Sequence, residues 1–183
     1  MEKHINNAGQ ELVVLSRDGK KATIQFTETG SVRTANIDNV RAGKVKDFYA
    51  KSSYGIGYSG EFEKVHYWKQ AKQLWQNMMK RCYSENDPRG YFGTGVVVSP
   101  RWHCFANFLV DLKELENFDK WVLGQSEGCE KYNLDKDTVV KDCKVYSKET
   151  CRFLSESENK ALGKKGKKLV IINDVKEWVL PNE

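Results

Sequence analysis

The hydrophobic pattern of this chain changes its period at a glycine-rich segment, and this change limits the folds that the chain can adopt. Before residue 54, apolar side chains alternate with polar ones or gather in short runs, as they do in β-strands. From Lys64 to Tyr83 they recur at the three- and four-residue spacing of an amphipathic helix. The segment between the two patterns is Tyr54-Gly55-Ile56-Gly57-Tyr58-Ser59-Gly60. We therefore expect an α+β chain with a small β-rich module at residues 1–60 and a second, mainly helical module at residues 61–183.

The first module is predicted to contain a small antiparallel sheet. Runs of β-favouring residues lie at 11–16, 22–27 and 31–36. Gly19 lies in the first connecting turn at a position that needs positive φ, and Gly30 closes the second turn. Three strands joined in this way form a meander, either a curved sheet or part of a barrel. We expect residues 1–8 to be a loose tail, and Gly43 to break any helix in residues 37–48.

The second module is predicted to contain two amphipathic helices, at residues 64–83 and 102–112. The apolar face of the first helix comprises Trp68, Ala71, Trp75, Met78, Met79 and Cys82. Residues 129–162 then have the pattern of a strand, an irregular loop, a second strand or turn, and a short helix, which is the outline of a ββα unit. A last strand is expected at residues 169–172, after a basic segment.

Composition and charge exclude several classes of protein. Charged residues make up 30% of the chain and hydrophobic residues 39%, which favours a folded chain over a disordered one. No apolar run has the length of a membrane helix, and the N-terminus lacks the apolar core of a secretory signal. Five cysteines without a CxxC pair favour reduced thiols over disulfides or a zinc site. We therefore expect a cytoplasmic protein without a membrane partner.

The net charge of +5 is distributed unevenly along the chain. Residues 111–130 are mostly acidic where they are charged, whereas residues 160–168 carry several lysines and no acidic side chain. A polyanion such as DNA would bind the second segment and avoid the first. The alternative is that the lysine-rich segment is a solvated loop.

An ordered series of landmarks runs through both modules. In the second module it comprises Trp68, Trp75, Met78, Met79, Arg81-Cys82-Tyr83, Trp102, Phe105, Phe108, Leu134-Asp135-Lys136-Asp137, Tyr146-Ser147, Glu149-Thr150-Cys151, Phe153 and Asn159. In the first module it comprises Phe26, Glu28-Thr29-Gly30, Ile37, Arg41, Gly43-Lys44-Val45-Lys46-Asp47, Gly55 and Gly57-Tyr58. This series resembles the HNH or homing endonucleases carried by tailed phages, and the resemblance covers most of residues 22–162.

The resemblance implies an HNH-like ββα module and metal-dependent hydrolysis of DNA. In active HNH enzymes a histidine takes a proton from water, while a carboxylate and an Asn or His hold one divalent metal ion. By resemblance, Asp135 and Asn159 stand at metal-binding positions, with Asp137 as a further carboxylate. Lys136 stands where the histidine is expected, and Thr150 stands where the middle Asn is expected. The implied catalytic set is therefore Asp135, Lys136 and Asn159, with Mg or Mn as the cofactor if the centre is active and no cofactor otherwise.

These positions also have simpler explanations. Asp135 and Asp137 would equally serve as a pair that caps a turn. Lys136 would act as a base only if burial or neighbouring cations lowered its pKa substantially; otherwise it would contact a phosphate or pair with Asp137. The histidines of the chain all lie outside the ββα pattern, at His4, His66 and His103.

Cations in both modules are candidates for DNA contact. They are Arg33, Arg41, Lys44, Lys46, Lys80, Arg81, Lys164, Lys165, Lys167 and Lys168. Phosphate contacts need only cations and donors on one surface, so DNA binding can survive the loss of catalysis. We therefore expect a phage-type endonuclease of duplex DNA with an impaired centre, in the cytoplasm of the host cell. The alternatives are a non-enzymatic protein on the same scaffold that binds DNA or inhibits a host protein, and a component of the virion.

Overall fold

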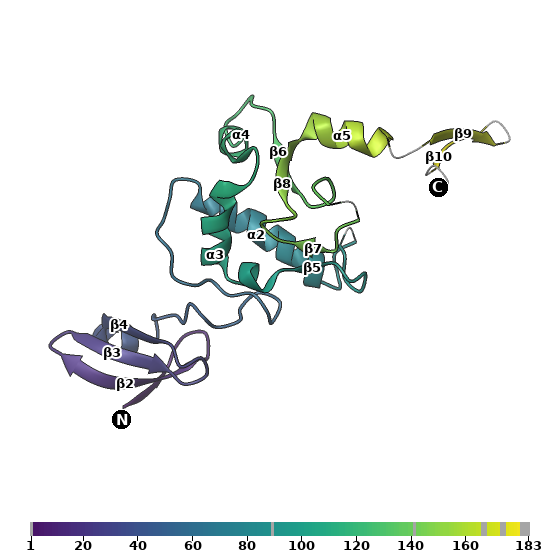
Figure 1. Ribbon diagram of the computed structural model, residues 1–183. Coiled ribbons are helices and arrows are strands. Elements are labelled where there is room, and N and C mark those ends of the chain that lie inside the picture. Colours follow the sequence, from purple (N-terminus) through teal and green to yellow (C-terminus); the bar gives the residue numbers. More distant parts are fainter. Residues whose placement is uncertain (1, 89, 141, 166–167, 173–174, 180–183) are drawn as a thin grey trace. The chain divides into compact units, whose positions relative to one another are not determined.

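The structure of the protein is a computed structural model that describes residues 2–88, 90–140, 142–165, 168–172 and 175–179, with the backbone alone from residue 163 onward. The chain is an α+β protein, as predicted (Figure 1). Its internal contacts divide it into unit 1, Met1–Lys64 with Pro100–Phe108, and unit 2, Val65–Ser99 with Leu109–Glu183. This division differs from the predicted boundary at 60/61 because it falls after Lys64 and assigns residues 100–108 to the first unit.

The segment at residues 100–108 belongs to unit 1 because it pairs with the glycine-rich segment through the backbone. It contains the 3₁₀ helix η1 (Pro100–His103) and the start of helix α3 (Phe105–Asp111). The Tyr58 N–H donates to the His103 carbonyl, and the Phe105 N–H donates to the Tyr58 carbonyl, each at 2.9 Å. Gly60 allows the close approach, since a Cβ atom there would lie 2.6 Å from the Cys104 Sγ. Local sequence patterns do not encode such a long-range pairing.

Unit 1 is built on a four-stranded antiparallel sheet with the strand order β1-β2-β3-β4. Its strands are β1 (Lys3–Ile5), β2 (Glu11–Asp18), β3 (Lys21–Phe26) and β4 (Val32–Asn36). The last three are the strands predicted from the sequence. Ala22, Ile24 and Phe26 alternate along β3 and are all buried, because successive side chains of a strand point to opposite faces. They form the core of the sheet with Leu12, Ile37, Val40 and Val45.

Two predictions for unit 1 were wrong. Residues 1–8 were predicted to be a loose tail, but residues 2–8, which the structure describes, are not, because β1 pairs with β2 and the buried Asn6 side chain donates to the Val45 carbonyl at 2.9 Å. Residues 37–48 do contain a helix, α1 (Ile37–Arg41), whose N-terminus is capped by Asn36. Gly43, at a φ of +66°, follows the end of this short helix rather than preventing it.

Unit 2 begins with helix α2 (Trp68–Tyr83), whose buried face comprises Ala71, Trp75, Met78, Met79 and Cys82. The predicted apolar stripe is therefore confirmed, apart from Trp68 at the first turn, which is only partly buried. The Tyr83 hydroxyl ties the end of α2 to strand β5 (Val97–Val98), since it accepts a hydrogen bond from the Val98 N–H at 3.0 Å. Strand β5 pairs in parallel with β7 (Val145–Tyr146).

The rest of unit 2 places an antiparallel hairpin against a short helix. The 3₁₀ helix η2 (Leu112–Glu114) leads into α4 (Phe118–Leu123). Strand β6 (Tyr132–Asp135) pairs with β8 (Arg152–Ser155), which continues into helix α5 (Glu156–Lys165). Trp121 of α4 stacks on Phe153 of β8, with ring centroids 5.1 Å apart. Strands β9 (Lys168–Ile172) and β10 (Val175–Val179) form a second hairpin.

The helices are all short or polar. In the part of the chain that the structure describes, none combines the length and the apolar character that a membrane crossing requires.

Candidate functional site

The β6–β8 hairpin and α5 follow one another in the order strand, loop, strand, helix (Figure 1). This is the ββα order that the sequence predicts for residues 129–162. The connecting loop at residues 136–151 includes the short strand β7. Asp135 is the last residue of β6, and it lies opposite Arg152 at the beginning of β8. The candidate catalytic residues Asp135 and Lys136 therefore stand where the hairpin opens into its loop.

The Asp135 carboxylate closes a turn. Its Oδ2 atom accepts hydrogen bonds from the Asp137 N–H at 3.1 Å, the Thr138 N–H at 2.9 Å and the Thr138 hydroxyl at 2.5 Å. The Arg152 Nε in turn donates to the Thr138 hydroxyl at 2.9 Å. One carboxylate oxygen thus satisfies three donors of its own loop, which is the turn-capping role that the sequence left open.

Lys136 lies inside unit 2 as a paired cation. Its side chain is 6% exposed, its Nζ atom donates to the Asp137 carboxylate, and the ring centroids of Tyr91 and Tyr146 lie 5.0 Å and 5.8 Å from it. Burial by itself would lower the pKa of Lys136, but the hydrogen bond and charge of Asp137 outweigh it, so the pKa of Lys136 is raised. A lysine acts as a base only when its pKa falls. Lys136 instead forms the ion pair that was the simpler explanation for it.

Thr150 supports the turn that follows β7. Its hydroxyl donates to the Val145 carbonyl at 2.7 Å and accepts from the Ser147 N–H at 3.0 Å. The hydroxyl therefore has partners on the backbone of its own loop, a common use of a threonine beside a turn. This arrangement places Thr150 in the architecture of the loop, at the position where the resemblance implies an Asn ligand.

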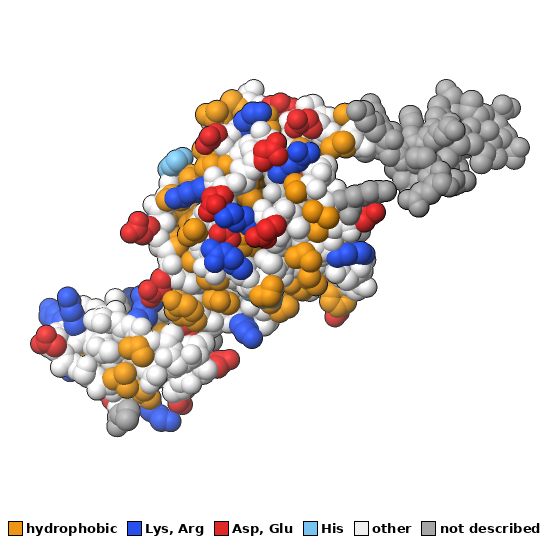
Figure 2. Space-filling model, in the orientation of Figure 1, with side chains coloured by type: hydrophobic (Ala, Val, Ile, Leu, Met, Phe, Trp, Pro, Cys, Tyr) orange, Lys and Arg blue, Asp and Glu red, His pale blue; other side chains and the backbone are white. Residues whose placement is uncertain are grey.

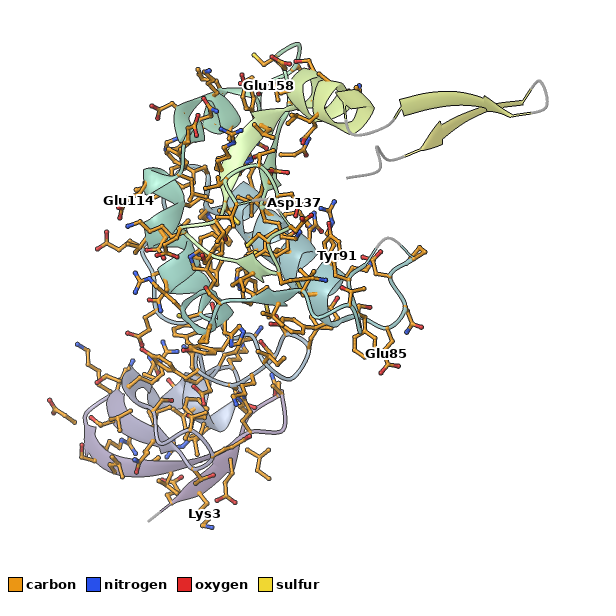
Figure 3. All side chains as sticks on the ribbon, turned by 45° about the vertical axis from the view of Figure 1, so that its right-hand side comes forward. Lys3, Glu85, Tyr91, Glu114, Asp137 and Glu158 are labelled. Atoms are coloured by element: carbon orange, nitrogen blue, oxygen red, sulfur yellow. The ribbon has the colours of Figure 1, made fainter. Side chains whose placement is uncertain are left out.

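Asn159 lies at the other end of the hairpin from Asp135. Tyr132 pairs with Ser155, the last residue of β8, and α5 starts immediately afterwards. Asp135 lies three residues after Tyr132 along β6, which corresponds to a rise of about 10 Å along the strand. Figure 3 labels Asp137 and Glu158 at these opposite ends. The structure therefore brings Asp135, Lys136 and Asp137 together but does not bring Asn159 to them.

The carboxylates of this region are engaged within the fold. The described residues contain no group of three or more His, Cys, Asp or Glu side chains arranged to hold a metal ion. The nearest carboxylates to the expected position already act in a turn and in an ion pair, at Asp135 and Asp137. A divalent ion would have to displace these contacts, since such ions need several free oxygen ligands.

The basic candidates of unit 1 gather more closely. Arg33, Lys44 and Lys46 line one surface hollow of about 330 Å³, together with Asn36 and Asn39. The Arg33 Nη1 atom donates to the Lys46 carbonyl at 2.9 Å, and its guanidinium lies 4.3 Å from the centre of the Phe48 ring. These contacts hold β4 and residues 44–48 as the two walls of the hollow.

A second hollow, of about 410 Å³, shares both lysines with the first. It is lined by Asn6, Asn7, Ala8 and Gly43 in addition to Lys44 and Lys46. Arg41 is exposed at the end of α1 and lines neither hollow. The sequence identified the cations of these hollows but not their asparagines. The signal that could have identified them is the N-cap residue Asn36, which places Asn36 and Asn39 around the start of α1.

The candidates of unit 2 are less concentrated. Lys80 and Arg81 line a hollow of about 250 Å³ with Asn77 and an acidic residue, Asp87. Arg81 and Tyr146, whose pKa is raised mainly by burial, also line a smaller hollow of unit 2. On the face of unit 2 shown in Figure 2, basic and acidic side chains are interspersed. The described residues on that face therefore form no continuous basic patch.

The remaining candidates follow Asn159. The backbones of Lys164 and Lys165 lie in α5 and that of Lys168 lies in β9, but their side chains lie outside the described part of the chain, as does Lys167 entirely.

No protein-family model, no curated protein and no solved structure matches this chain.

Proposed function

We propose that the protein binds duplex DNA through phosphate contacts made by unit 1, and that the Asp135–Lys136 region supports the fold rather than cleaving DNA. The observation that carries this proposal is that Arg33, Lys44 and Lys46 line one surface hollow of unit 1. Three cations on one surface match the needs of phosphate binding, which depends on charge and donors rather than on sequence-specific contacts.

The two lysines flank a buried residue and share the solvent side of their segment. Val45 is buried in the sheet core, whereas Lys44 and Lys46 on either side of it are exposed. Residues i and i+2 of an extended segment share a face and lie about 6.6 Å apart along the chain. This arrangement suits contact with neighbouring phosphates of one strand, because both ammonium groups can reach the same side.

The nearest carboxylate in the sequence does not neutralise this surface by pairing with the lysines. The Asp47 side chain accepts hydrogen bonds from the Thr29 hydroxyl at 2.5 Å, the Ser31 hydroxyl at 2.9 Å and the Tyr49 N–H at 2.9 Å. Its carboxylate is therefore hydrogen-bonded to the β3–β4 turn and to the backbone of its own segment. The cations of the hollow keep their charge available to an anion.

Backbone donors at the open edge of β4 add to the cations. The Ile37 N–H donates to the Lys20 carbonyl and the Phe26 N–H donates to the Ser31 carbonyl, so alternate pairs between β3 and β4 are hydrogen-bonded. By this alternation, Thr34 belongs to a non-hydrogen-bonded pair with Thr23, and its N–H points away from β3. Thr34 lines the hollow, so its N–H is a further donor for a phosphate oxygen.

A salt titration tests this proposal. We expect a duplex to bind at low salt and the logarithm of the association constant to fall linearly with the logarithm of salt concentration, with a slope of about −0.9 per phosphate contact. Three contacts give a slope of about −3. Absence of binding at low salt, or a slope near zero, would remove the proposal.

A metal-dependent nuclease is the second candidate, and the strand–loop–strand–helix order that places Asp135 at the end of β6 favours it. Catalysis would require Asn159 to approach Asp135 and a base to replace the histidine that the ββα segment lacks. Incubation of supercoiled plasmid with Mg or Mn tests it. Nicking that disappears in Asp135→Ala, while DNA binding persists, would establish the nuclease and contradict the structural role that we assign to this region.

A further inference from the structure

The turn at residues 53–56 holds a bulky aromatic side chain in a backbone conformation that such residues rarely adopt. Tyr54 has a φ of +53° and Gly55 a φ of +68°, and the Ile56 N–H donates to the Ser53 carbonyl at 3.1 Å. Two consecutive positive φ values with this hydrogen bond are the pattern of a type I′ turn, which lies here within a three-residue loop because the Gly57 N–H also donates to the Ser53 carbonyl at 2.8 Å. The first central position of such a turn normally carries Asn, Asp or Gly, because a Cβ-bearing residue is disfavoured there.

Burial of the Tyr54 side chain does not account for this strained backbone conformation. Tyr54 is 45% exposed, although Ser53 and Gly57 pair below it and fix the turn. A strained residue that is not explained by packing is a reason to look for a binding role. The position of the ring at the tip of a short hairpin makes it available to a partner.

A second exposed ring lies on the same segment. Tyr49 is also 45% exposed, and it is held against Tyr58 with ring centroids 6.1 Å apart. Between the two exposed tyrosines lies the exposed Lys51, and residues 48–60 include no acidic side chain. The segment thus combines flat apolar surfaces with a positive charge and lacks any group that would repel a phosphate.

We infer that Tyr54 is a stacking residue for an unpaired nucleobase, at a single-stranded or gapped stretch of the DNA that unit 1 holds. The inference rests on the proposed function and adds to it the form of nucleic acid that binds best. Every base offers a π-face, so stacking on tyrosine tolerates any sequence, while Lys51 can contact the adjoining phosphate. The rigid turn fixes the ring before binding, which reduces the conformational entropy that stacking would otherwise cost.

The test compares two gapped duplexes that differ only within the gap. One carries bases there, including the fluorescent base 2-aminopurine, and the other carries abasic sites. We expect the full chain to bind the first duplex roughly tenfold more tightly than the second, and the 2-aminopurine fluorescence to be quenched on binding. The substitution Tyr54→Asn should abolish both the preference and the quenching while leaving the affinity for the abasic duplex unchanged.

Tyr54→Asn is the informative variant because Asn-Gly is the favoured pair of a type I′ turn, so the fold should be at least as stable by thermal unfolding. Phe92→Ala removes a ring of similar exposure, 51%, from a loop of unit 2 and serves as the matched control. The inference would be overturned if the wild type bound the base-containing and abasic duplexes equally well. It would also be overturned if Tyr54→Asn kept the preference for the base-containing duplex, or if Phe92→Ala lost that preference as fully as Tyr54→Asn does. Failure of the wild type to bind even the abasic duplex would instead contradict the phosphate contacts of the proposed function. The two failures are therefore distinguishable.

Discussion

Lys136 is paired with the carboxylate of its sequence neighbour Asp137. In this pair the lysine side chain is buried and the aspartate side chain is exposed. The Lys136 side chain is 6% exposed, whereas the Asp137 side chain is 53% exposed. Two tyrosine rings, Tyr91 from another loop and Tyr146 from strand β7, lie close to the ammonium group. The position at which the family resemblance implies a catalytic histidine is therefore occupied by a cation that lies between the Tyr91 ring and the Tyr146 ring of strand β7.

Removal of the Asp137 charge should destabilise the fold. In Asp137→Asn the buried ammonium of Lys136 loses its charged partner, which we expect to lower the free energy of unfolding by about 1–3 kcal/mol. In the double variant Lys136→Met/Asp137→Asn the buried cation is replaced by an apolar side chain, and most of this loss should be recovered. Urea unfolding of the three proteins provides the measurement. Equal stability of Asp137→Asn and the wild type would show that the pair does not hold the loops together.

The same pair predicts a loss of stability at alkaline pH. The pKa of Lys136 is raised in the folded protein above its ordinary value of 10.5, so the folded state binds the proton more tightly than the unfolded state. The stabilisation is therefore complete below about pH 10.5 and is lost as the pH rises through the raised pKa. The difference in stability between the wild type and Lys136→Met should shrink over this range, and a difference that stays constant would contradict the assignment.

Divalent metal ions should leave the thermal stability of the protein unchanged. The Oδ2 atom of Asp135 caps the turn to Thr138, and Asp137 is paired with Lys136, so neither side chain offers a prepared ligand set. We expect the Tm in millimolar Mg or Mn to equal that in a chelator. A rise in Tm with metal that disappears in Asp135→Asn would reveal a metal centre, because a ligand that binds only the folded state stabilises it.

Gly43 should be far less replaceable than Gly19, although both have positive φ. A Cβ atom at Gly43 would lie 2.5 Å from the Asn7 Oδ1 and 3.1 Å from the Asn7 N, whereas one at Gly19 would meet nothing within 4 Å. Gly19→Ala should therefore cost only the conformational penalty of about 1–2 kcal/mol, and Gly43→Ala should cost more. Thermal unfolding of the two variants measures the difference. Equal costs would show that Asn7 does not pack against this turn as described.

Local patterns were sufficient to predict most of the regular elements. The alternation of Ala22, Ile24 and Phe26 and the helical spacing of Trp75, Met78 and Cys82 each specify a face that must be buried. Strand β1 was missed because Lys3-His4-Ile5 carries no amphipathic signal and exists through its pairing with β2. Helix α1 was missed because its five residues depend on the Asn36 cap and on burial of Ile37 and Val40.

The candidate sites were predictable as residue types but not as arrangements. Lys136 could be identified from the ordered landmarks, but its burial depends on Tyr91, which comes from a distant loop, and on Tyr146 of strand β7. The separation of Asp135 from Asn159 depends on the register of β6 and β8 and on the direction in which α5 leaves the hairpin. The grouping of Arg33 with Lys44 and Lys46 likewise requires β4 to lie beside residues 44–48.

The salt dependence of duplex binding by Lys44→Gln/Lys46→Gln tests the central claim most directly. The matched control is Lys20→Gln/Lys21→Gln, which removes two exposed lysines from the β2–β3 turn region without altering either hollow. We predict that the first variant binds a duplex more weakly and that its log–log salt slope is smaller in magnitude by about 2, because each lysine–phosphate contact contributes about 1. The control should retain the wild-type slope. An unchanged slope in Lys44→Gln/Lys46→Gln, or an equal change in the control, would contradict DNA binding through this surface.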